Sequence, residues 1–164
     1  MINYTIISSP IGKLLLAKSI RGLNHIIFEH KIPRFEAIIR VDFPDQKIIN
    51  NDNALKTEIN QLKEYFSGLR KEFDIKLDLA MPPFYQKVLN IVNKIPYGKY
   101  LSYQEVATKA GNSKASRAAG SANARNPIPI IIPCHRVLAS GGKLGGYGGG
   151  IKIKKYLLKL EGIQ

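Results

Sequence analysis

The stretch from Ile130 to Leu138 limits most strongly what this chain can fold into. It is a largely apolar run, and proline occurs within it and just before it, at Pro127, Pro129 and Pro133. Because proline lacks a backbone N–H and disfavours helical geometry in the residue before it, the stretch cannot be a helix. We therefore expect a buried extended segment, which presents Cys134, the only cysteine among 164 residues.

Cys134 is followed directly by His135 and Arg136. A cysteine reacts as its thiolate, and neighbouring groups that carry positive charge or accept a proton favour that form. The arrangement therefore suggests a nucleophilic cysteine. A single cysteine on a hydrophobic run can also be an inert core residue, and these three residues do not decide between the two interpretations.

Composition restricts the class of protein. Hydrophobic residues make up 45% of the chain, yet no apolar run approaches the roughly 20 residues of a membrane span. The first residues have neither the basic start nor the apolar core of a signal peptide. A single cysteine forbids an internal disulfide and fits a reducing compartment. It also argues against a structural zinc site. We expect a cytoplasmic protein with no metal, no cofactor and no membrane partner.

Charge is distributed unevenly along the chain. Lys and Arg number 25 against 12 for Asp and Glu, a net charge of +13. Residues 1–93 hold 13 basic and 10 acidic side chains, whereas residues 94–164 hold 12 basic and 2 acidic ones. A basic half of this kind indicates a polyanionic partner, of which nucleic acid is the main candidate. An acidic membrane surface is the alternative, but the basic residues do not line one amphipathic helix.

The first half of the chain predicts a sheet with helices. Residues 2–7, 13–18 and 23–29 are rich in large apolar residues and are separated by turns, which indicates a three-stranded antiparallel meander. A short helix around Phe35–Arg40 and a longer one over Asn53–Phe66 follow from helical apolar spacing. A strand or an extended linker is expected from Leu69 to Leu79. We place a domain boundary at the two prolines after Met81, giving domains 1–80 and 81–164.

The second half predicts a helix-turn-helix. After a helix over Phe84–Ile95, Ser102 and Glu105 have the spacing of a capping box that begins a helix ending at Gly111. The next helix, Ser113–Arg125, is rich in Ala and contains no large aliphatic residue. Its small side chains permit a close approach to the minor groove of DNA, about 6 Å wide. Tight packing against a neighbouring helix would explain them as well.

The chain ends with a glycine-rich loop, residues 140–150, and an amphipathic helix over Ile151–Leu160. The loop lacks the ending of a nucleotide phosphate-binding motif, so we expect it to approach a ligand through its backbone. Glu161 follows the last helix, where an acidic residue is unfavourable for the helix dipole. It either pairs with nearby lysines or has a specific partner.

These residues resemble a known family. Pro133-Cys134-His135-Arg136-Val137, preceded by Asn126-Pro127-Ile128-Pro129 and by Ser116-Arg117-Ala118-Ala119-Gly120, is similar to the methylated-DNA–protein-cysteine methyltransferases, which repair 6-O-alkylguanine. The match is collinear from Phe84 to Gly162. A weaker likeness in the first half lies at Ser9-Pro10-Ile11-Gly12 and Tyr65-Phe66-Ser67-Gly68.

The resemblance implies an α/β fold, in which a ribonuclease-H-like sheet-and-helix domain precedes a mostly helical domain. It implies a monomer that binds duplex DNA in the minor groove, flips out an O6-alkylguanine (or an O4-alkylthymine) and transfers the alkyl group irreversibly to Cys134. The implied catalytic residues are Cys134, His135, Glu161, Asn126 and Tyr103. The implied DNA contacts are Arg117, which enters the base stack, with Tyr85, Gln104, Asn112, Ala118 and Ser140. The implied substrate pocket is formed by Pro129, Val137, Tyr147, Gly148 and Gly149.

Two positions depart from the pattern of the family. Gly148 stands where some members have Ser, so only its backbone N–H can contact the guanine oxygen. Asn123 replaces a larger apolar residue that packs on the extruded base in some members. Two other functions compete with repair. A non-catalytic sensor of alkylated DNA is disfavoured because such relatives carry Trp in place of the cysteine, and a cysteine hydrolase would need an acyl-binding feature.

Overall fold

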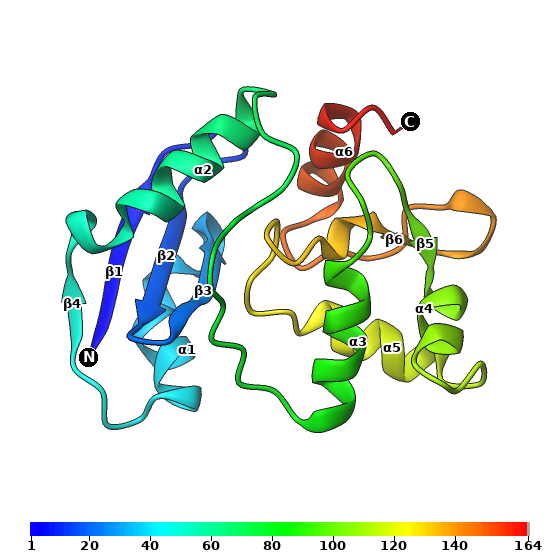
Figure 1. Ribbon diagram of the computed structural model, residues 1–164, viewed down its shortest axis with the longest axis horizontal. Helices are drawn as coiled ribbons and strands as arrows, with labels where there is room; N and C mark the ends of the chain where they lie inside the picture. The colour runs from blue at the N-terminus through cyan, green and yellow to red at the C-terminus, as the bar shows by residue number, and fades with distance from the viewer. Residues whose placement is uncertain (164) are drawn as a thin grey trace. The chain divides into compact units, whose positions relative to one another are not determined.

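A computed structural model describes residues 1–163 and divides the chain into two compact units, Met1–Ala80 and a second that starts at Met81. The first unit is built on a four-stranded sheet with the strand order β3-β2-β1-β4 (Figure 1). The strands are β1 (Ile2–Ile7), β2 (Leu14–Ser19), β3 (Gly22–Phe28) and β4 (Ile48–Asn50). The expected antiparallel meander is confirmed for β1 to β3. β4, which pairs parallel with β1, was not predicted, because three residues are too few to show alternation.

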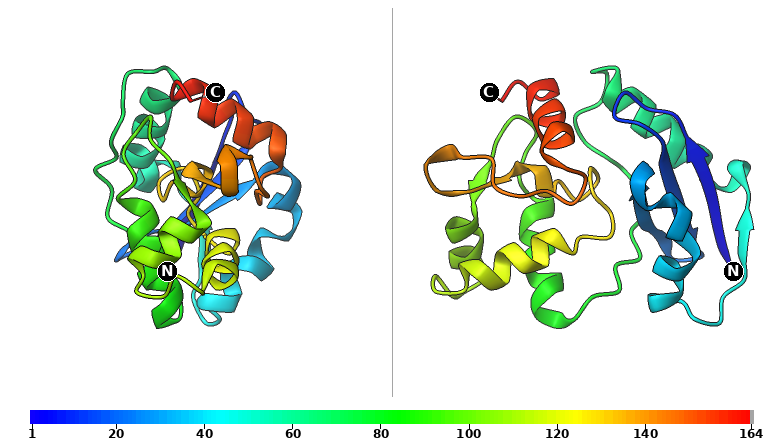
Figure 2. Two further views of the ribbon diagram at one scale, coloured as in Figure 1. Left: turned by 90° about the vertical axis from the view of Figure 1, so that its right-hand side faces the viewer. Right: turned by 180° about the vertical axis from the view of Figure 1, so that it is seen from behind.

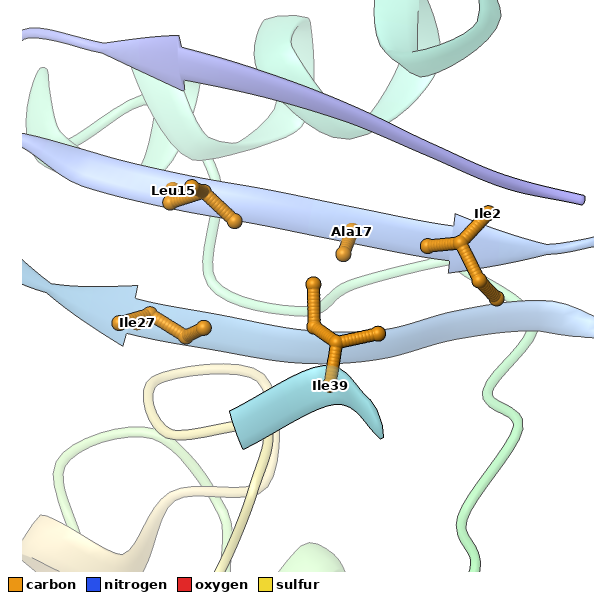
Figure 3. Close-up of a cluster of buried hydrophobic side chains, with 5 residues drawn as sticks. All are labelled: Ile2, Leu15, Ala17, Ile27 and Ile39. Carbon is orange, nitrogen blue, oxygen red and sulfur yellow. The ribbon is translucent and has the colours of Figure 1, made fainter. Parts of the chain in front are cut away.

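Both faces of this sheet are covered. Successive residues of a strand point to opposite faces, and the four residues from Leu14 to Ala17 are all fully buried. Helix α1 (Phe35–Asp42) covers one face, where Ile39 packs into a cluster with Ile2, Leu15, Ala17 and Ile27 (Figure 3). Helix α2 (Lys56–Phe66) lies on the opposite face (Figures 1 and 2). Two short 3-10 helices precede these helices, η1 (Glu29–Arg34) and η2 (Asp52–Leu55).

The segment from Leu69 to Leu79 is irregular, and it contacts the sheet through a bridge between Leu77 and Leu23 and a hydrogen bond from Ser19 to Asp78. Of the two predicted alternatives, the extended linker is therefore the correct one. Gly22 makes this contact possible. Its φ is +147°, and a Cβ at this position would lie 2.5 Å from the carbonyl oxygen of Lys76.

The second unit is mostly helical. Its helices are α3 (Pro83–Asn93), α4 (Tyr103–Lys109), α5 (Ser116–Ala124) and α6 (Ile151–Leu160). A small parallel sheet joins β5 (Leu101–Ser102) to β6 (Val137–Leu138), and so ties the start of α4 to the residues that follow Cys134. One further 3-10 turn, η4 (Ser140–Gly142), begins the glycine-rich loop.

The predicted helix-turn-helix consists of α4 and α5. Both halves of the capping box at Ser102 and Glu105 form, and Gly111 adopts a φ of +94° just after α4 ends. Helix α5 contacts both α3 and α4, and the side chains that it buries are small, those of Ala119, Ala122 and Asn123. The absence of large residues therefore allows close packing inside the unit as well as leaving a small-sided outer surface.

The segment around Cys134 is buried as predicted, but it is not extended throughout. Residues 128–138 are all buried. Cys134–Arg136 form a 3-10 turn (η3), and Ile130 has a φ of +76°. The prolines exclude an α-helix, but a single tight turn needs only the hydrogen bond from Arg136 N to Pro133 O, which is present. An apolar pattern predicts burial here and does not determine the shape of the backbone.

Over residues 1–163, every helix is too short or too polar to cross a bilayer.

Candidate active site

A cavity of about 730 Å³ lies beside Cys134 in the second unit. Helices α4 and α5 form one side of it, and the glycine-rich loop forms another. Nine of the residues expected in the site line this cavity: Tyr103, Gln104, Arg117, Asn126, Pro129, Cys134, Ser140, Tyr147 and Gly148. Segments that are far apart in the sequence thus meet at the single cysteine.

The other expected residues lie outside the lining. His135 and Glu161 are buried behind Cys134, and Val137 is fully buried in β6. Gly149 follows the last lining residue of the loop. Three expected DNA contacts also lie away from the cavity: Tyr85 on α3, Asn112 in the turn after α4 and Ala118 on the exposed side of α5.

Cys134 is buried, with 5% of its surface exposed. Burial is the largest influence on this thiol and raises its pKa, because a low dielectric disfavours the thiolate. The side chains of Asn126 and Tyr147 and the charge of Lys154 act in the opposite direction and lower the pKa. The thiol is therefore protonated at rest and surrounded by groups that favour its ionisation.

His135 and Glu161 form a fully buried pair, with 2.7 Å between Nε2 and Oε2. A carboxylate can only accept, so Nε2 must carry the hydrogen, and Nδ1 is then the unprotonated nitrogen of a neutral ring. Nδ1 is buried and has no hydrogen-bond partner among residues 1–163. Burial lowers the pKa of His135, while Glu161 raises it. The ring is thus held as a neutral base with one nitrogen able to accept a proton.

Arg136 completes this buried group. Its Nε and Nη2 donate to the two carboxylate oxygens of Glu161 at 2.7 and 3.0 Å, and its Nη1 donates to the carbonyl of Ile95 at 2.6 Å. Of the two alternatives for Glu161, a specific partner is therefore correct. The bidentate guanidinium fixes the carboxylate in place beside His135.

Asn126 braces the turn before Cys134. Its Oδ1 accepts a hydrogen bond from Ile128 N at 2.9 Å, and its Nδ2 donates to Ile132 O at 2.8 Å. One side chain thereby closes both ends of the proline-rich segment.

Tyr103 begins α4 and lies between two glycines. A Cβ on Gly120 would lie 3.6 Å from the tyrosine ring, and a Cβ on Gly145 would lie 3.3 Å from the ring and from its hydroxyl oxygen. Burial is the largest influence on the phenol and raises its pKa; Cys134 adds to this effect and a hydrogen bond from Asn123 opposes it. A side chain at Gly145 would crowd the ring, whereas one at Gly120 would only touch it, so the lack of a side chain at Gly145 leaves the ring its place.

Lys154 on α6 is a functional candidate that the sequence reasoning missed. It is fully buried, and its Nζ donates to the carbonyls of Val137 at 2.8 Å, Leu144 at 2.5 Å and Gly146 at 3.2 Å. Burial lowers its pKa to about 8. One ammonium group thus joins β6 to the glycine-rich loop and places a positive charge near Cys134. The signal in the sequence was a lysine in phase with the apolar face of α6, at Leu157 and Leu158.

Comparisons with known proteins agree with this geometry. The family model described as "6-O-methylguanine DNA methyltransferase, ribonuclease-like domain" matches residues 2–79, and the one described as "6-O-methylguanine DNA methyltransferase, DNA binding domain" matches residues 83–163. A methylated-DNA–protein-cysteine methyltransferase of Methanosarcina acetivorans is 44% identical over 159 residues, which cover 97% of each chain. One of Mycobacterium tuberculosis is 43% identical over 161 residues, covering 98% of this chain and 93% of its own.

Solved structures show the same fold. The crystal structure of the O6-methylguanine methyltransferase of Mycobacterium tuberculosis has a TM-score of 0.86 at 40% identity, covering 98% of this chain and 93% of its own. A structure of OGT from the same organism in complex with DNA has a TM-score of 0.86 at 41% identity, covering 97% of this chain and 92% of its own. The expected arrangement of a ribonuclease-like domain followed by a helical domain is confirmed. This chain belongs to the 6-O-methylguanine DNA methyltransferase family.

Proposed function

We propose that this protein repairs DNA by direct reversal, moving the alkyl group of an O6-alkylguanine, and of an O4-alkylthymine, from duplex DNA to Cys134. The observation that carries the proposal is the placement of Cys134, at the wall of a cavity with the buried His135–Glu161 pair behind it. Cysteine, base and orienting carboxylate are the elements of an activated nucleophile. Family membership supplies the substrate class.

The first step activates the thiol. His135 lies next to Cys134 in a 3-10 turn, where successive side chains point about 120° apart. The ring therefore takes the thiol proton on Nδ1 through a bridging water, and Glu161 stabilises the imidazolium that results. The Sγ of the thiolate then attacks the alkyl carbon, and the bond from that carbon to the guanine oxygen breaks.

The second requirement is a proton for the departing base. Electrons from the broken bond pass into the guanine ring, and Tyr103 donates its phenolic proton to a ring nitrogen. Tyr103 lines the cavity beside Gly120 and Gly145, so its hydroxyl faces the space that the base enters. Return of the proton from imidazolium to phenolate leaves a neutral thioether and an unmodified guanine.

The helix-turn-helix binds the DNA. Arg117 on α5 is exposed and borders the cavity, which suits a side chain that fills the stack when the base leaves it. Gln104 and Ser140 border the cavity too, and Tyr85, Asn112 and Ala118 contact the backbone farther out. The small outer side chains of α5 fit the narrow minor groove. Poor pairing of an alkylated guanine lowers the free energy needed to extrude it.

The extruded base occupies the cavity. Pro129, Tyr147 and Gly148 line it, so they contact the base directly. Val137 supports the pocket from behind through β6, and Gly149 gives the loop its freedom to close. The protein acts once per molecule, as a cytoplasmic monomer associated with the nucleoid while bound to DNA. The single cysteine, which leaves no second thiol to regenerate the first, supports single use.

The test is a comparison of Cys134→Ser with the unaltered protein. Serine keeps the size of the side chain but is a far weaker nucleophile at neutral pH, so methyl transfer from methylated duplex should be abolished. Duplex affinity should be preserved, because the basic helix-turn-helix surface is unchanged. Methyl transfer by Cys134→Ser would refute the proposal. Selective binding of methylated duplex by the unaltered protein, without any transfer, would identify a sensor instead.

A further inference from the structure

Asn123 lies at the centre of the site without a role in the steps described above. It stands near the end of α5, lines the cavity and is 6% exposed. Its Nδ2 donates a hydrogen bond to the main-chain carbonyl of Cys134 at 3.1 Å. Because a carbonyl oxygen only accepts, the nitrogen of the side chain must face Cys134, and this fixes which way the carboxamide points.

Tyr103 lines the same cavity, and its ring lies beside Gly120, which precedes Asn123 by one turn on α5. Asn123 lowers the pKa of Tyr103, against the larger effect of burial, which raises it. A donor that lowers the pKa of a phenol does so by favouring the phenolate. A carboxamide nitrogen has two hydrogens, so it can serve the Cys134 carbonyl and the Tyr103 oxygen together.

We propose that Asn123 is a positioning residue for the leaving-group step, in which it holds the phenol of Tyr103 and stabilises the phenolate formed when that phenol gives its proton to the guanine. The inference rests on the proposed function and deepens it. The phenolic proton moves to a guanine ring nitrogen as the carbon–oxygen bond breaks, and the negative charge left on the phenol oxygen receives the Asn123 N–H. The bond to Cys134 O keeps the carboxamide in place throughout.

Asn123 is one of the two positions that depart from the family pattern, and the proposed role gives this departure a function. The resemblance marks Asn123 as a polar residue where some members carry a larger apolar one that packs on the extruded base. In the structure the residue is buried and bonded to the Cys134 segment. A polar residue at this position therefore contributes hydrogen bonds to the reaction, whereas an apolar one contributes only packing.

The first experiment replaces Asn123 by leucine, which has a similar size and no donor. Methyl transfer from methylated duplex should slow by about 10-fold or more, because general-acid assistance contributes about 100-fold or more. Alkylation of Cys134 by a haloacetamide, whose halide leaves without a proton, should change by less than about 2-fold. Duplex affinity should be equally unaffected. The exposed Asn90 of α3 provides a matched control, and Asn90→Leu should leave all three quantities unchanged.

The second experiment shows whether Asn123 acts through Tyr103. In a double-mutant cycle, residues that act through one another are not additive. Once Tyr103→Phe has removed the phenol, adding Asn123→Leu should slow methyl transfer by less than about 2-fold. Full additivity of the two substitutions would overturn the proposal. So would a haloacetamide reaction slowed as much as methyl transfer, because Asn123 would then act on the cysteine itself.

Folding and the underlying function are controlled separately. Circular dichroism and thermal melting show whether Asn123→Leu is folded. If it is not, Asn123→Asp, which has the same shape without the N–H donors, is used in its place. Methyl transfer at the unaltered rate by either folded variant would contradict the assignment. Failure of the unaltered protein to accept a methyl group would instead reject the proposed function.

Discussion

Glu161, the residue after α6, accepts a hydrogen bond from Nε2 of His135 at 2.7 Å, and neither side chain is exposed. The carboxylate also receives two hydrogen bonds from Arg136. A single acidic residue thus both orients a histidine behind Cys134 and balances the charge of a buried arginine. We therefore expect catalysis and stability to depend on the same group.

Replacement of Glu161 by glutamine should impair both. Without the carboxylate the pKa of His135 falls further, because Glu161 raises it against burial, so the ring accepts the thiol proton less readily. Arg136 loses its counter-charge inside the protein, and breaking a buried ion pair typically costs about 3–5 kcal/mol. We expect slower methyl transfer, with an apparent pKa of Cys134 that is raised, and a lower melting temperature.

Glu105 is the natural control, since it is exposed and is the other acidic residue after position 93. Glu105→Gln removes the same charge and should have little effect on either quantity. An unchanged pH–rate profile for Glu161→Gln would show that Glu161 is purely structural.

Lys154→Met should raise the pKa of Cys134, because the ammonium group lowers it. The carbonyls of Val137, Leu144 and Gly146 also lose their shared donor, so the loop should loosen. The pH dependence of haloacetamide alkylation should move to higher pH, and proteolysis within the loop should become faster. Lys155→Met, on the exposed side of α6, should change neither. A profile that coincides with that of the unaltered protein would contradict the role of the Lys154 charge.

Binding to duplex should depend strongly on salt. About five phosphate contacts would give a slope of about −4 to −5 for the logarithm of affinity against that of salt concentration. Arg117→Ala should slow methyl transfer more than it weakens binding, if Arg117 fills the space left by the base as we propose. Lys114→Ala, which removes an exposed charge in the same region, should weaken binding and slow methyl transfer by the same factor. If Arg117→Ala reduces duplex binding and methyl transfer by the same factor, Arg117 is a phosphate contact and does not fill the base stack.

Because His25 in β3 is buried, we expect the protein to lose stability as the solution becomes acidic. Burial lowers its pKa from 6.5 to about 4. The unfolded chain therefore binds a proton between these values and the folded chain does not, so stability falls as pH falls from about 6.5 to about 4. This difference in the pKa of His25 corresponds to on the order of 3 kcal/mol in the free energy of unfolding.

Urea unfolding at a series of pH values measures this effect. His25→Asn should remove most of the fall in that window, and His30→Asn, at an exposed position, should retain it. An identical pH dependence in His25→Asn and the unaltered protein would show that other groups are responsible. Asp42, whose carboxylate lies 3.7 Å from His25 and whose pKa is raised by burial, is the first of these.

Much of the fold could be predicted because its signals are local. The strands of the meander, the capping box at Ser102 and the helix over Ile151–Leu160 all follow from periodicity and end signals within a few residues. Strand β4 could not be predicted, because it forms only through its distant pairing with β1. The 3-10 turn at Cys134 was missed because an apolar run indicates burial, whether the buried backbone is extended or forms a tight turn.

The functional site could be predicted only in part, and that part came from the resemblance instead of from local patterns. The resemblance named residues that line the cavity, such as Tyr103 and Tyr147, but it did not indicate what holds them. The hydrogen bonds of Asn123 and Lys154 join segments that are distant in the chain. The position of Lys154 on the apolar face of α6 indicates burial, but only the fold shows which groups these two polar side chains contact.

The central claim, that Cys134 is a sacrificial alkyl acceptor, is tested most directly by stoichiometry. A known amount of protein is incubated with excess methylated duplex, and unmodified guanine is counted while the intact protein is weighed. The account predicts a plateau at one guanine per protein molecule, with the mass of one methyl group added on the peptide that contains Cys134. Several guanines per protein molecule, or a methyl group on any other peptide, would contradict it.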